Sequence, residues 1–168
     1  MKHFFQCGFI VLFFIFLSGC DNDPVCTKEV SSDRLATVDQ TRLAADIITI
    51  DNYLAQNSIT AMQDPSGLRY VISTPGSGDS PCLESFVTVN YTGRLLSNGN
   101  IFDSSAAPVQ FPLTNLILGW QIGFPLMPKG SIATLYIPSG YGYGSNGAGA
   151  SIPPNANLIF NVELINFR

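Results

Sequence analysis

From Leu68 onward, short runs of β-branched and aromatic residues alternate with turns that contain glycine, proline and asparagine. Runs of this kind, bounded by turn residues, predict β-strands. The expected strands span residues 68–72, 86–91, 101–103, 111–113, 132–137 and 158–167. Asn98-Gly99 predicts a hairpin turn between two of them, because asparagine and glycine tolerate the positive φ angles that such turns require. The chain is therefore expected to form an antiparallel sheet.

One segment of this half does not fit a strand. Residues 115–122 read NLILGWQI, which is too apolar for a surface helix and predicts one short buried helix capped by Thr114. A loop rich in glycine and proline, residues 139–154, separates the last two strands. An antiparallel sheet with one helix packed on it is an α+β domain, which we expect over residues 65–168.

The residues before this domain carry a helical pattern. Four apolar residues recur at spacings of four and three: Leu43, Ile47, Ile50 and Leu54. This spacing predicts an amphipathic helix that begins at Thr37 or Asp39, with Asp46 and Asp51 mostly on its solvent-facing side. The apolar stripe either packs on the neighbouring domain or pairs with a second copy, which would form a dimer through residues 37–57.

The chain before the helix is expected to be a tether. Residues 20–36 are mostly polar, contain Pro24 and show no periodicity, which is typical of a flexible linker. The helical extension that follows spans residues 37–64 and is closed by the turn Asp64-Pro65-Ser66-Gly67.

The first residues have the layout of a secretory signal. Lys2 precedes an apolar run that is too short to span a bilayer, and small residues follow. Leu17-Ser18-Gly19-Cys20 resembles the lipobox of bacterial lipoproteins, which implies removal of residues 1–19 and lipid on Cys20. We therefore expect an exported protein of the bacterial cell envelope, anchored to a membrane through several acyl chains. The alternatives are an uncleaved anchor and an ordinary signal, with Cys20 bonded to Cys26.

Two further cysteines are available for a disulfide. Cys7 leaves with the predicted signal, so Cys26 and Cys82 remain as a pair in an oxidising compartment. The sequence leaves two outcomes open, a disulfide between them or two free thiols.

Several classes of chemistry are excluded. The only histidine, His3, lies in the predicted signal, so Ser-His-Asp and Cys-His mechanisms are not available to the mature chain. No metal is expected, because Cys26 and Cys82 alone cannot form a structural zinc site and no CxxC motif is present. No cofactor is expected either, because Gly142–Gly147 matches G-x-G-x-x-G without the helix that a dinucleotide site requires. The formal net charge is -4 and no basic patch is present, so nucleic acid is not an expected partner.

What remains is a set of aromatic residues with one well-placed acid, arranged in five motifs. In chain order these are Val89-Asn90-Tyr91-Thr92-Gly93, Phe102-Asp103-Ser104-Ser105, Gly119-Trp120, Tyr136-Ile137-Pro138 with Tyr141-Gly142-Tyr143-Gly144, and Ile152–Ala156 with Phe160–Leu164. Together they resemble the FKBP family of peptidyl-prolyl cis-trans isomerases from Leu68 to Phe167. The resemblance implies a twisted antiparallel sheet wrapped around a short helix. Five motifs in order, with compatible spacing, make a chance match improbable.

The resemblance also implies a site that binds proline-containing polypeptides. Trp120 would form the floor under the proline ring, and the backbone N–H of Ile117 and the hydroxyl of Tyr143 would donate to substrate carbonyls. The implied catalytic residues are Tyr91, Phe102, Asp103, Trp120, Tyr143 and Phe160. The implied substrate-binding residues are Phe111, Leu116, Ile117, Gly142 and Ile152.

One departure from the family concerns Asp103. Family members often have an arginine in the flap after F-D-S-S, whereas residues 106–109 read AAPV and offer no cation. Asp103 is therefore expected to depend on tyrosine or backbone donors. Two functional alternatives to an isomerase stay open: a binding or chaperone module without useful turnover, and an interaction protein that works through the helix at residues 37–56.

Overall fold

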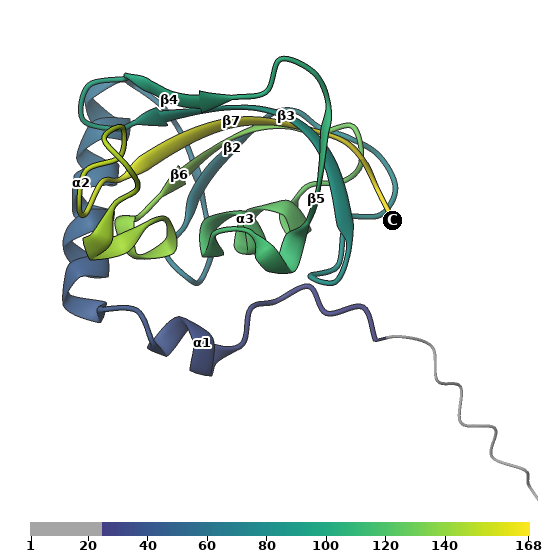
Figure 1. Ribbon diagram of the computed structural model, residues 1–168, viewed down its shortest axis with the longest axis horizontal. Coiled ribbons are helices and arrows are strands. Elements are labelled where there is room, and N and C mark those ends of the chain that lie inside the picture. Colours follow the sequence, from purple (N-terminus) through teal and green to yellow (C-terminus); the bar gives the residue numbers. More distant parts are fainter. Residues whose placement is uncertain (1–24) are drawn as a thin grey trace, which may run out of the picture.

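The computed structural model describes residues 25–168, so the predicted signal and Cys20 lie outside the described residues. Within this part of the chain, seven strands form one sheet in the order β1-β2-β6-β7-β3-β4, with β5 paired to β3, and all pairs are antiparallel. The strands are β1 (Met62–Gln63), β2 (Arg69–Thr74), β3 (Phe86–Leu95), β4 (Ile101–Ser104), β5 (Val109–Pro112), β6 (Ile132–Ile137) and β7 (Leu158–Phe167). The sheet curves over the short helix α3 (Leu118–Gly123), as Figure 1 shows. The predicted α+β fold is confirmed.

The interior of the domain lies between α3 and the sheet. Alternate residues of β7 face it and are buried: Leu158, Phe160, Val162 and Leu164. Two glycines of α3 allow the helix to approach β6. A Cβ atom on Gly119 would lie 2.5 Å from Ile137 Cγ2. A Cβ atom on Gly123 would lie 2.7 Å from Leu135 Cδ1. Glycine at these positions therefore lets Trp120 pack close to the sheet.

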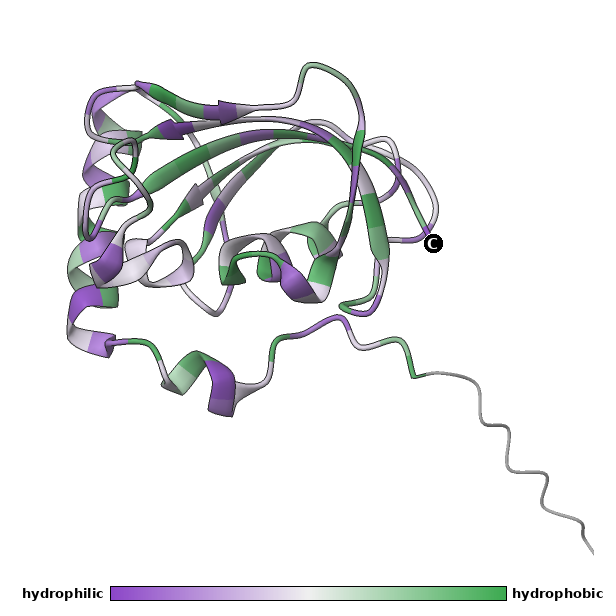
Figure 2. Ribbon diagram, viewed as in Figure 1, coloured by the Kyte–Doolittle hydropathy of each residue, from purple (hydrophilic) through white to green (hydrophobic). Residues whose placement is uncertain are grey.

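Helix α2 (Gln40–Gln56) covers the other face of the sheet. It begins after Asp39, whose carboxylate accepts a hydrogen bond from the Arg42 N–H at 3.0 Å, as one of the two predicted starts requires. A second buried cluster joins Ile50 and Leu54 of α2 to Tyr136 of β6 and Ile159 of β7, whose side chains point away from α3, and to Leu96, which follows β3. Figure 2 shows hydrophobic and hydrophilic residues alternating along α2. The predicted apolar stripe packs on this chain's own sheet.

A disulfide and an ion pair hold the N-terminal residues to the domain. Cys26 and Cys82 form a disulfide with a Cα–Cα distance of 5.2 Å, which is one of the two outcomes left open by the sequence. The ion pair joins α2 to β2. Arg69 Nε lies 2.8 Å from Asp51 Oδ1, and Arg69 Nη2 lies 2.9 Å from Asp51 Oδ2. This two-point contact is the strongest geometry for an arginine and a carboxylate.

Asp46 corrects one expectation from the sequence. It was expected on the solvent-facing side of the helix, but only 1% of it is exposed. Its Oδ2 accepts two hydrogen bonds from Ser139, one from the backbone N–H at 2.9 Å and one from the hydroxyl. A prediction from helical periodicity assigns polar residues such as aspartate to the surface. It cannot include a hydrogen-bond partner that lies 93 residues away in the chain.

The helix boundaries contain two further differences. Helix α3 begins at Leu118 after a turn of 3-10 helix, η1 (Leu113–Asn115), and its first cap, Ile117, has no side-chain hydrogen bond. Thr114 therefore does not cap α3. Part of the predicted tether is helical, because Ser31 caps a short helix, α1 (Ser32–Ala36). None of the helices in residues 25–168 combines the length and the apolar character needed to cross a membrane.

Candidate active site

An aromatic cavity of about 190 Å³ lies between the sheet and the N-terminal end of α3. Strands β3, β4, β5 and β7 contribute four of its lining residues, α3 and the loop before it contribute three, and the loop after β6 contributes one. The lining consists of Tyr91, Asp103, Phe111, Leu116, Ile117, Trp120, Tyr143 and Phe160. All eight belong to the set that the resemblance implied. They span more than fifty positions in the sequence, so only the folded sheet brings them together.

Trp120 lines the cavity and is only 4% exposed. Its ring packs edge-on against Tyr91 with a centroid distance of 5.3 Å and against Phe160 at 5.2 Å. From behind, Phe124 packs on the same ring at 5.0 Å. Edge-to-face contacts of this kind contribute about 0.5–1.5 kcal/mol each beyond the area they bury. The indole is therefore held rigidly from two sides.

Phe102 supports this cavity without lining it. Its ring packs edge-on against Phe160 with a centroid distance of 5.5 Å. Both rings lie against Gly93 of β3, where a Cβ atom would be 2.6 Å from Phe102 Cε2 and 2.8 Å from Phe160 Cε1. The glycine of the V-x-Y-T-G motif therefore has a steric reason, because any side chain there would displace two aromatic rings.

The polar rim consists of two phenols and one carboxylate. Tyr91 donates a hydrogen bond from its hydroxyl to Asp103 Oδ2 at 2.7 Å, which confirms that Asp103 depends on a tyrosine. Burial raises the pKa of Tyr91 from 10.0 to about 12, with added contributions from that hydrogen bond and from the charges of Asp103 and Tyr143. Burial also raises the pKa of Tyr143, and the Asp103 charge adds to the effect. Both phenols therefore keep their protons near neutral pH.

The loop before α3 contributes Ile117 to the lining of the cavity. The carbonyl of Ile117 accepts from the N–H groups of Trp120 and Gln121, but its own N–H forms no hydrogen bond within residues 25–168. Gln121 holds this loop in place, since its Nε2 donates to Leu116 O at 2.6 Å and to Thr114 O at 3.1 Å. Gln121 was missed from the sequence. The only available signal in the sequence was one glutamine within the apolar run of residues 116–122, and the structure shows that this side chain is fully buried.

Besides Phe102, two residues of the implied set do not line the cavity. Ile152 is buried in a tight turn, where its backbone N–H and carbonyl both pair with Ala148, at 3.1 Å and 2.8 Å. Gly142 lies beside Leu158, and a Cβ atom there would be 2.9 Å from Leu158 Cδ1. Both residues belong to the loop between β6 and β7 that carries Tyr143. The structure thus brings together eight of the eleven implied residues and places three in their support.

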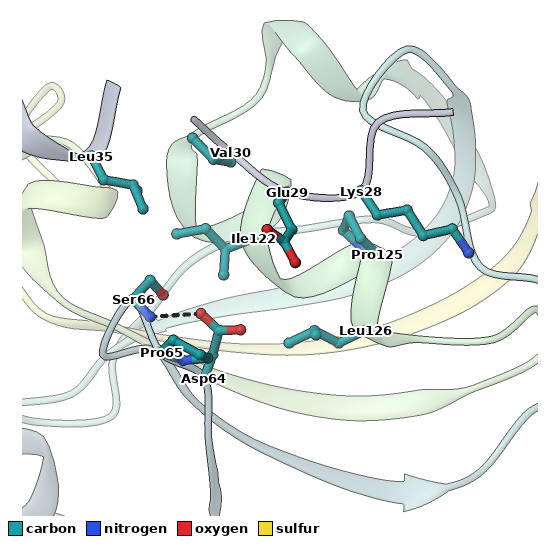
Figure 3. Close-up of a pocket in the computed structure, with 10 residues that line it drawn as sticks. All are labelled: Lys28, Glu29, Val30, Leu35, Asp64, Pro65, Ser66, Ile122, Pro125 and Leu126. Carbon is teal, nitrogen blue, oxygen red and sulfur yellow. Dashed lines mark hydrogen bonds between the residues drawn. The ribbon is translucent and has the colours of Figure 1, made fainter. Parts of the chain in front are cut away.

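A larger hollow of about 370 Å³ lies away from the aromatic cavity, between residues 28–35, the turn at residues 64–66 and the far side of α3 (Figure 3). Its lining includes two acidic residues, Glu29 and Asp64. The carboxylate of Asp64 accepts a hydrogen bond from the Ser66 N–H at 2.9 Å, within its own turn. The other walls are mainly aliphatic side chains and prolines, and no aromatic ring is among them. The aromatic cavity is therefore the better candidate for binding a proline ring, although it is smaller.

Comparisons with known proteins show what this chain is similar to. A family model described as FKBP-type peptidyl-prolyl cis-trans isomerase matches residues 78–165. The chain is 48% identical over 103 residues to a probable FKBP-type peptidyl-prolyl cis-trans isomerase, FkpA, of Neisseria meningitidis serogroup B, a match that covers 60% of this chain and 38% of the relative. It is 39% identical over 107 residues to the outer membrane protein MIP of Legionella longbeachae, covering 62% of this chain and 46% of the relative.

A solved structure is also similar to this chain. The crystal structure of a peptidyl-prolyl cis-trans isomerase from Pseudomonas syringae pv. tomato superposes with a TM-score of 0.65 at 35% sequence identity. The match covers 74% of this chain and 94% of that one. The curated relatives are longer, and the chain spans half of their length or less in the first four matches.

Proposed function

This chain belongs to the family of FKBP-type peptidyl-prolyl cis-trans isomerases, and we propose that it catalyses rotation about X-Pro bonds in polypeptides. The observation that carries the proposal is the cavity of about 190 Å³ floored by the buried ring of Trp120. Its volume and apolar walls suit a proline ring, and its rim offers hydrogen-bond donors for the flanking carbonyls. The names of the relatives support the same activity.

The reaction needs no nucleophile and no proton transfer. The rotation barrier of about 20 kcal/mol comes from amide resonance, which is lost when the bond twists. A catalyst must therefore bind the twisted amide better than either planar form. An apolar cavity contributes by excluding the water that stabilises the polar planar amide. Lowering the barrier by about 6 kcal/mol would accelerate rotation by roughly four orders of magnitude.

Each residue of the cavity has a place in this mechanism. Trp120 holds the proline ring from below, and the rings of Tyr91 and Phe160 limit its movement, with Phe102 behind them. The free N–H of Ile117 and the hydroxyl of Tyr143 donate to carbonyls beside the proline, which fixes one flank while the other turns. Asp103 orients the Tyr91 hydroxyl at the rim. Leu116 and Phe111 close the apolar walls, and Gly142 and Ile152 shape the loop that carries Tyr143.

A coupled protease assay or exchange NMR on Xaa-Pro peptides tests this proposal. The purified chain is compared with Asp103→Ala and Phe160→Ala, and we expect a clear acceleration that both substitutions reduce. Equal rates for all three proteins at the uncatalysed level would leave the alternative, a peptide-binding or chaperone module that retains the fold. In that case the same peptides would still bind the chain and would quench or shift the fluorescence of Trp120.

We also propose that the protein acts outside the cytoplasm, anchored through lipid on Cys20. The sequence of residues 1–20 carries this proposal, and the name of the Legionella longbeachae relative, an outer membrane protein, is in keeping with it. The disulfide between Cys26 and Cys82 supports export, because disulfides persist in oxidising compartments. Mass spectrometry of the mature N-terminus is the test. An unmodified Cys20 would exclude the lipid anchor.

A dimer through residues 37–57 is a further proposal for the partner of this chain. Because the apolar stripe of α2 packs on its own sheet, a second copy would have to contact the outward face of the helix, where Ile48 is 62% exposed. Analytical ultracentrifugation of the chain and of Ile48→Lys decides the matter. A monomer at all concentrations would remove the proposal.

A further inference from the structure

An ion pair on α2 contacts the loop that carries Tyr143. Arg42 Nε lies 2.9 Å from Asp46 Oδ1, and the carboxylate of Asp46 is buried, with 1% exposure. Its other oxygen, Oδ2, accepts from both the N–H and the hydroxyl of Ser139. Ser139 is fully buried and stands four positions before Tyr143. Its N–H also lies 2.9 Å from the side-chain oxygen of Asn157.

Arg42 of the same ion pair is also connected to the residue that follows Tyr143 in the chain. Arg42 Nη2 donates to the carbonyl oxygen of Asn155 at 3.1 Å. The backbone N–H of Asn155 in turn donates to the carbonyl oxygen of Gly144 at 2.8 Å. Gly144 directly follows Tyr143 in the chain. Two side chains of the N-terminal helix, one turn apart, therefore hold the loop both before and after Tyr143.

Other contacts from the N-terminal residues act on the same loop. A Cβ atom on Gly140 would collide with the side chain of Val38, so the chain before α2 packs directly on the loop backbone. The hydroxyl of Tyr141 donates to Ser66 O at 2.7 Å, in the turn that follows the helical extension. The first part of the loop, residues 139–143, is thus held by α2, by Val38 and by the turn at residues 64–67.

Asp46 is not needed merely to attach α2 to the sheet. Ile50 and Leu54 already bury their side chains against it, and Asp51 pairs with Arg69 at two points. Burying a carboxylate is costly unless all of its partners are supplied, and apolar side chains would pack a helix at lower cost. The buried carboxylate therefore contributes something other than helix packing, and its hydrogen bonds all point to the loop.

We propose that Asp46, with Arg42, is a positioning residue that holds the Tyr143 hydroxyl at the rim of the aromatic cavity. The N-terminal helical extension would thereby belong to the working site, although it contributes no residue to the lining of the cavity. This inference rests on the proposed function, in which Tyr143 donates to a substrate carbonyl. A donor that is displaced by about 1 Å loses much of its effect on the rate.

The test compares Asp46→Ala with the matched control Asp51→Ala, which removes a carboxylate from the same helix and also leaves an arginine unpaired. We expect kcat/KM for an Xaa-Pro peptide to fall roughly tenfold in Asp46→Ala, while Asp51→Ala stays within about twofold of the unchanged chain. Ser139→Ala is the milder variant, used if Asp46→Ala does not fold, and is expected to lose activity in the same direction. Equal losses in the two aspartate variants would overturn the proposal.

A double-mutant cycle with Tyr143→Phe separates positioning from general loss of structure. If Asp46 acts through Tyr143, removing the hydroxyl should cost clearly less in Asp46→Ala than in the unchanged chain. Fully additive losses would contradict the proposal. The cycle is run on Ser139→Ala in the same way.

A spectroscopic readout keeps this test independent of catalysis. In ¹³C-tyrosine NMR spectra, with the Tyr143 signal assigned from Tyr143→Phe, we expect that signal to shift or broaden in Asp46→Ala and Ser139→Ala but not in Asp51→Ala. A chain without isomerase activity would remove the proposed function, yet this signal would still report on the loop. An unchanged Tyr143 signal in Asp46→Ala and Ser139→Ala would refute the positioning role whatever the activity.

Discussion

The hydroxyl of Tyr91 donates to the carboxylate of Asp103, and the two oxygens lie 2.7 Å apart. Within the described residues, no lysine or arginine forms an ion pair with this aspartate. The flap that follows Asp103 reads AAPV and carries no charge. A neutral phenol therefore satisfies the carboxylate, and the rim of the cavity keeps a net negative charge that the Tyr91 and Tyr143 hydroxyls experience directly.

This relationship predicts a titration. Burial and the contact with Asp103 raise the pKa of Tyr91 to about 12, so replacing Asp103 with asparagine should lower that pKa toward the usual value. The Tyr91 signal in ¹³C-tyrosine NMR spectra, followed from pH 8 to 12.5, measures the change. The signal is assigned by its absence in Tyr91→Phe. An unchanged titration of Tyr91 in Asp103→Asn would show that the hydrogen bond does not form in solution.

The raised pKa of Tyr91 also makes the stability of the protein depend on pH. Because the folded pKa of Tyr91 lies above the value of 10.0 expected when unfolded, its contribution to stability is complete below pH 10 and is lost as pH rises toward 12. Urea unfolding between pH 8 and 11.5 should show stability falling less steeply in Tyr91→Phe than in the unchanged chain.

Phe160 provides a test of the cavity wall against the general core. Phe160→Ala and Leu164→Ala both truncate buried residues on the same face of β7, and each should lower the free energy of unfolding by about 2–5 kcal/mol. Only Phe160 lines the cavity. We expect isomerase activity below saturation to fall at least tenfold in Phe160→Ala and to change little in Leu164→Ala, measured where both variants are fully folded. Equal activities would mean that the aromatic cavity is not the site.

Gly93 gives a second test from the opposite direction, by adding one methyl group. In Gly93→Ala the new Cβ would be 2.6 Å from the Phe102 ring and 2.8 Å from the Phe160 ring, so both rings must move. We expect a stability loss of about 1–3 kcal/mol and a drop in activity. The control is Gly99→Ala, which meets nothing within 4 Å but has a φ of 73°. It should lose roughly 1 kcal/mol from backbone strain and keep its activity.

The disulfide should affect stability without affecting catalysis. The bond between Cys26 and Cys82 closes a loop with a sequence separation of 56, and the loop-entropy relation puts its contribution at about 4 kcal/mol. Cys82→Ser should therefore unfold at lower urea concentration. Neither cysteine lines the aromatic cavity, so activity on short peptides should stay within about twofold. Unchanged stability would indicate that the bond does not form in the protein as purified.

The sheet was predictable from local sequence because its strands carry their own pattern. β6 and β7 occupy the residues expected for them, 132–137 and 158–167, and β3 exceeds its expected range by four residues. The stripe of α2 also lies where its periodicity placed it. β1, with only two residues, has no pattern of its own and exists because it pairs with β2. Thr114 failed as a cap because η1 interrupts the chain before α3, a turn that no propensity at that position indicates.

Some residues of the candidate site could likewise be predicted from the sequence, and others could not. Trp120, Tyr91 and Phe160 were selected through the resemblance of five motifs to the FKBP family, which can be read from the sequence alone. Whether a given member faces the cavity depends on strand pairing and loop closure. Ile152 and Gly142 match the family motif but lie in the supporting loop, while Gln121, which holds the loop before α3, matched no pattern.

The sequence by itself determined that this chain forms an antiparallel sheet with one short apolar helix packed on it, and the resemblance of its motifs to the FKBP family implied the aromatic set. Strand patterns and turn residues act over a few neighbouring positions, so they can be read without a structure. Only the tertiary structure decided that Asp46 is buried. Its burial depends on Ser139, a residue remote in the chain that folding brings within hydrogen-bond distance. A buried carboxylate is stable only where such partners converge, and convergence is a property of the whole fold.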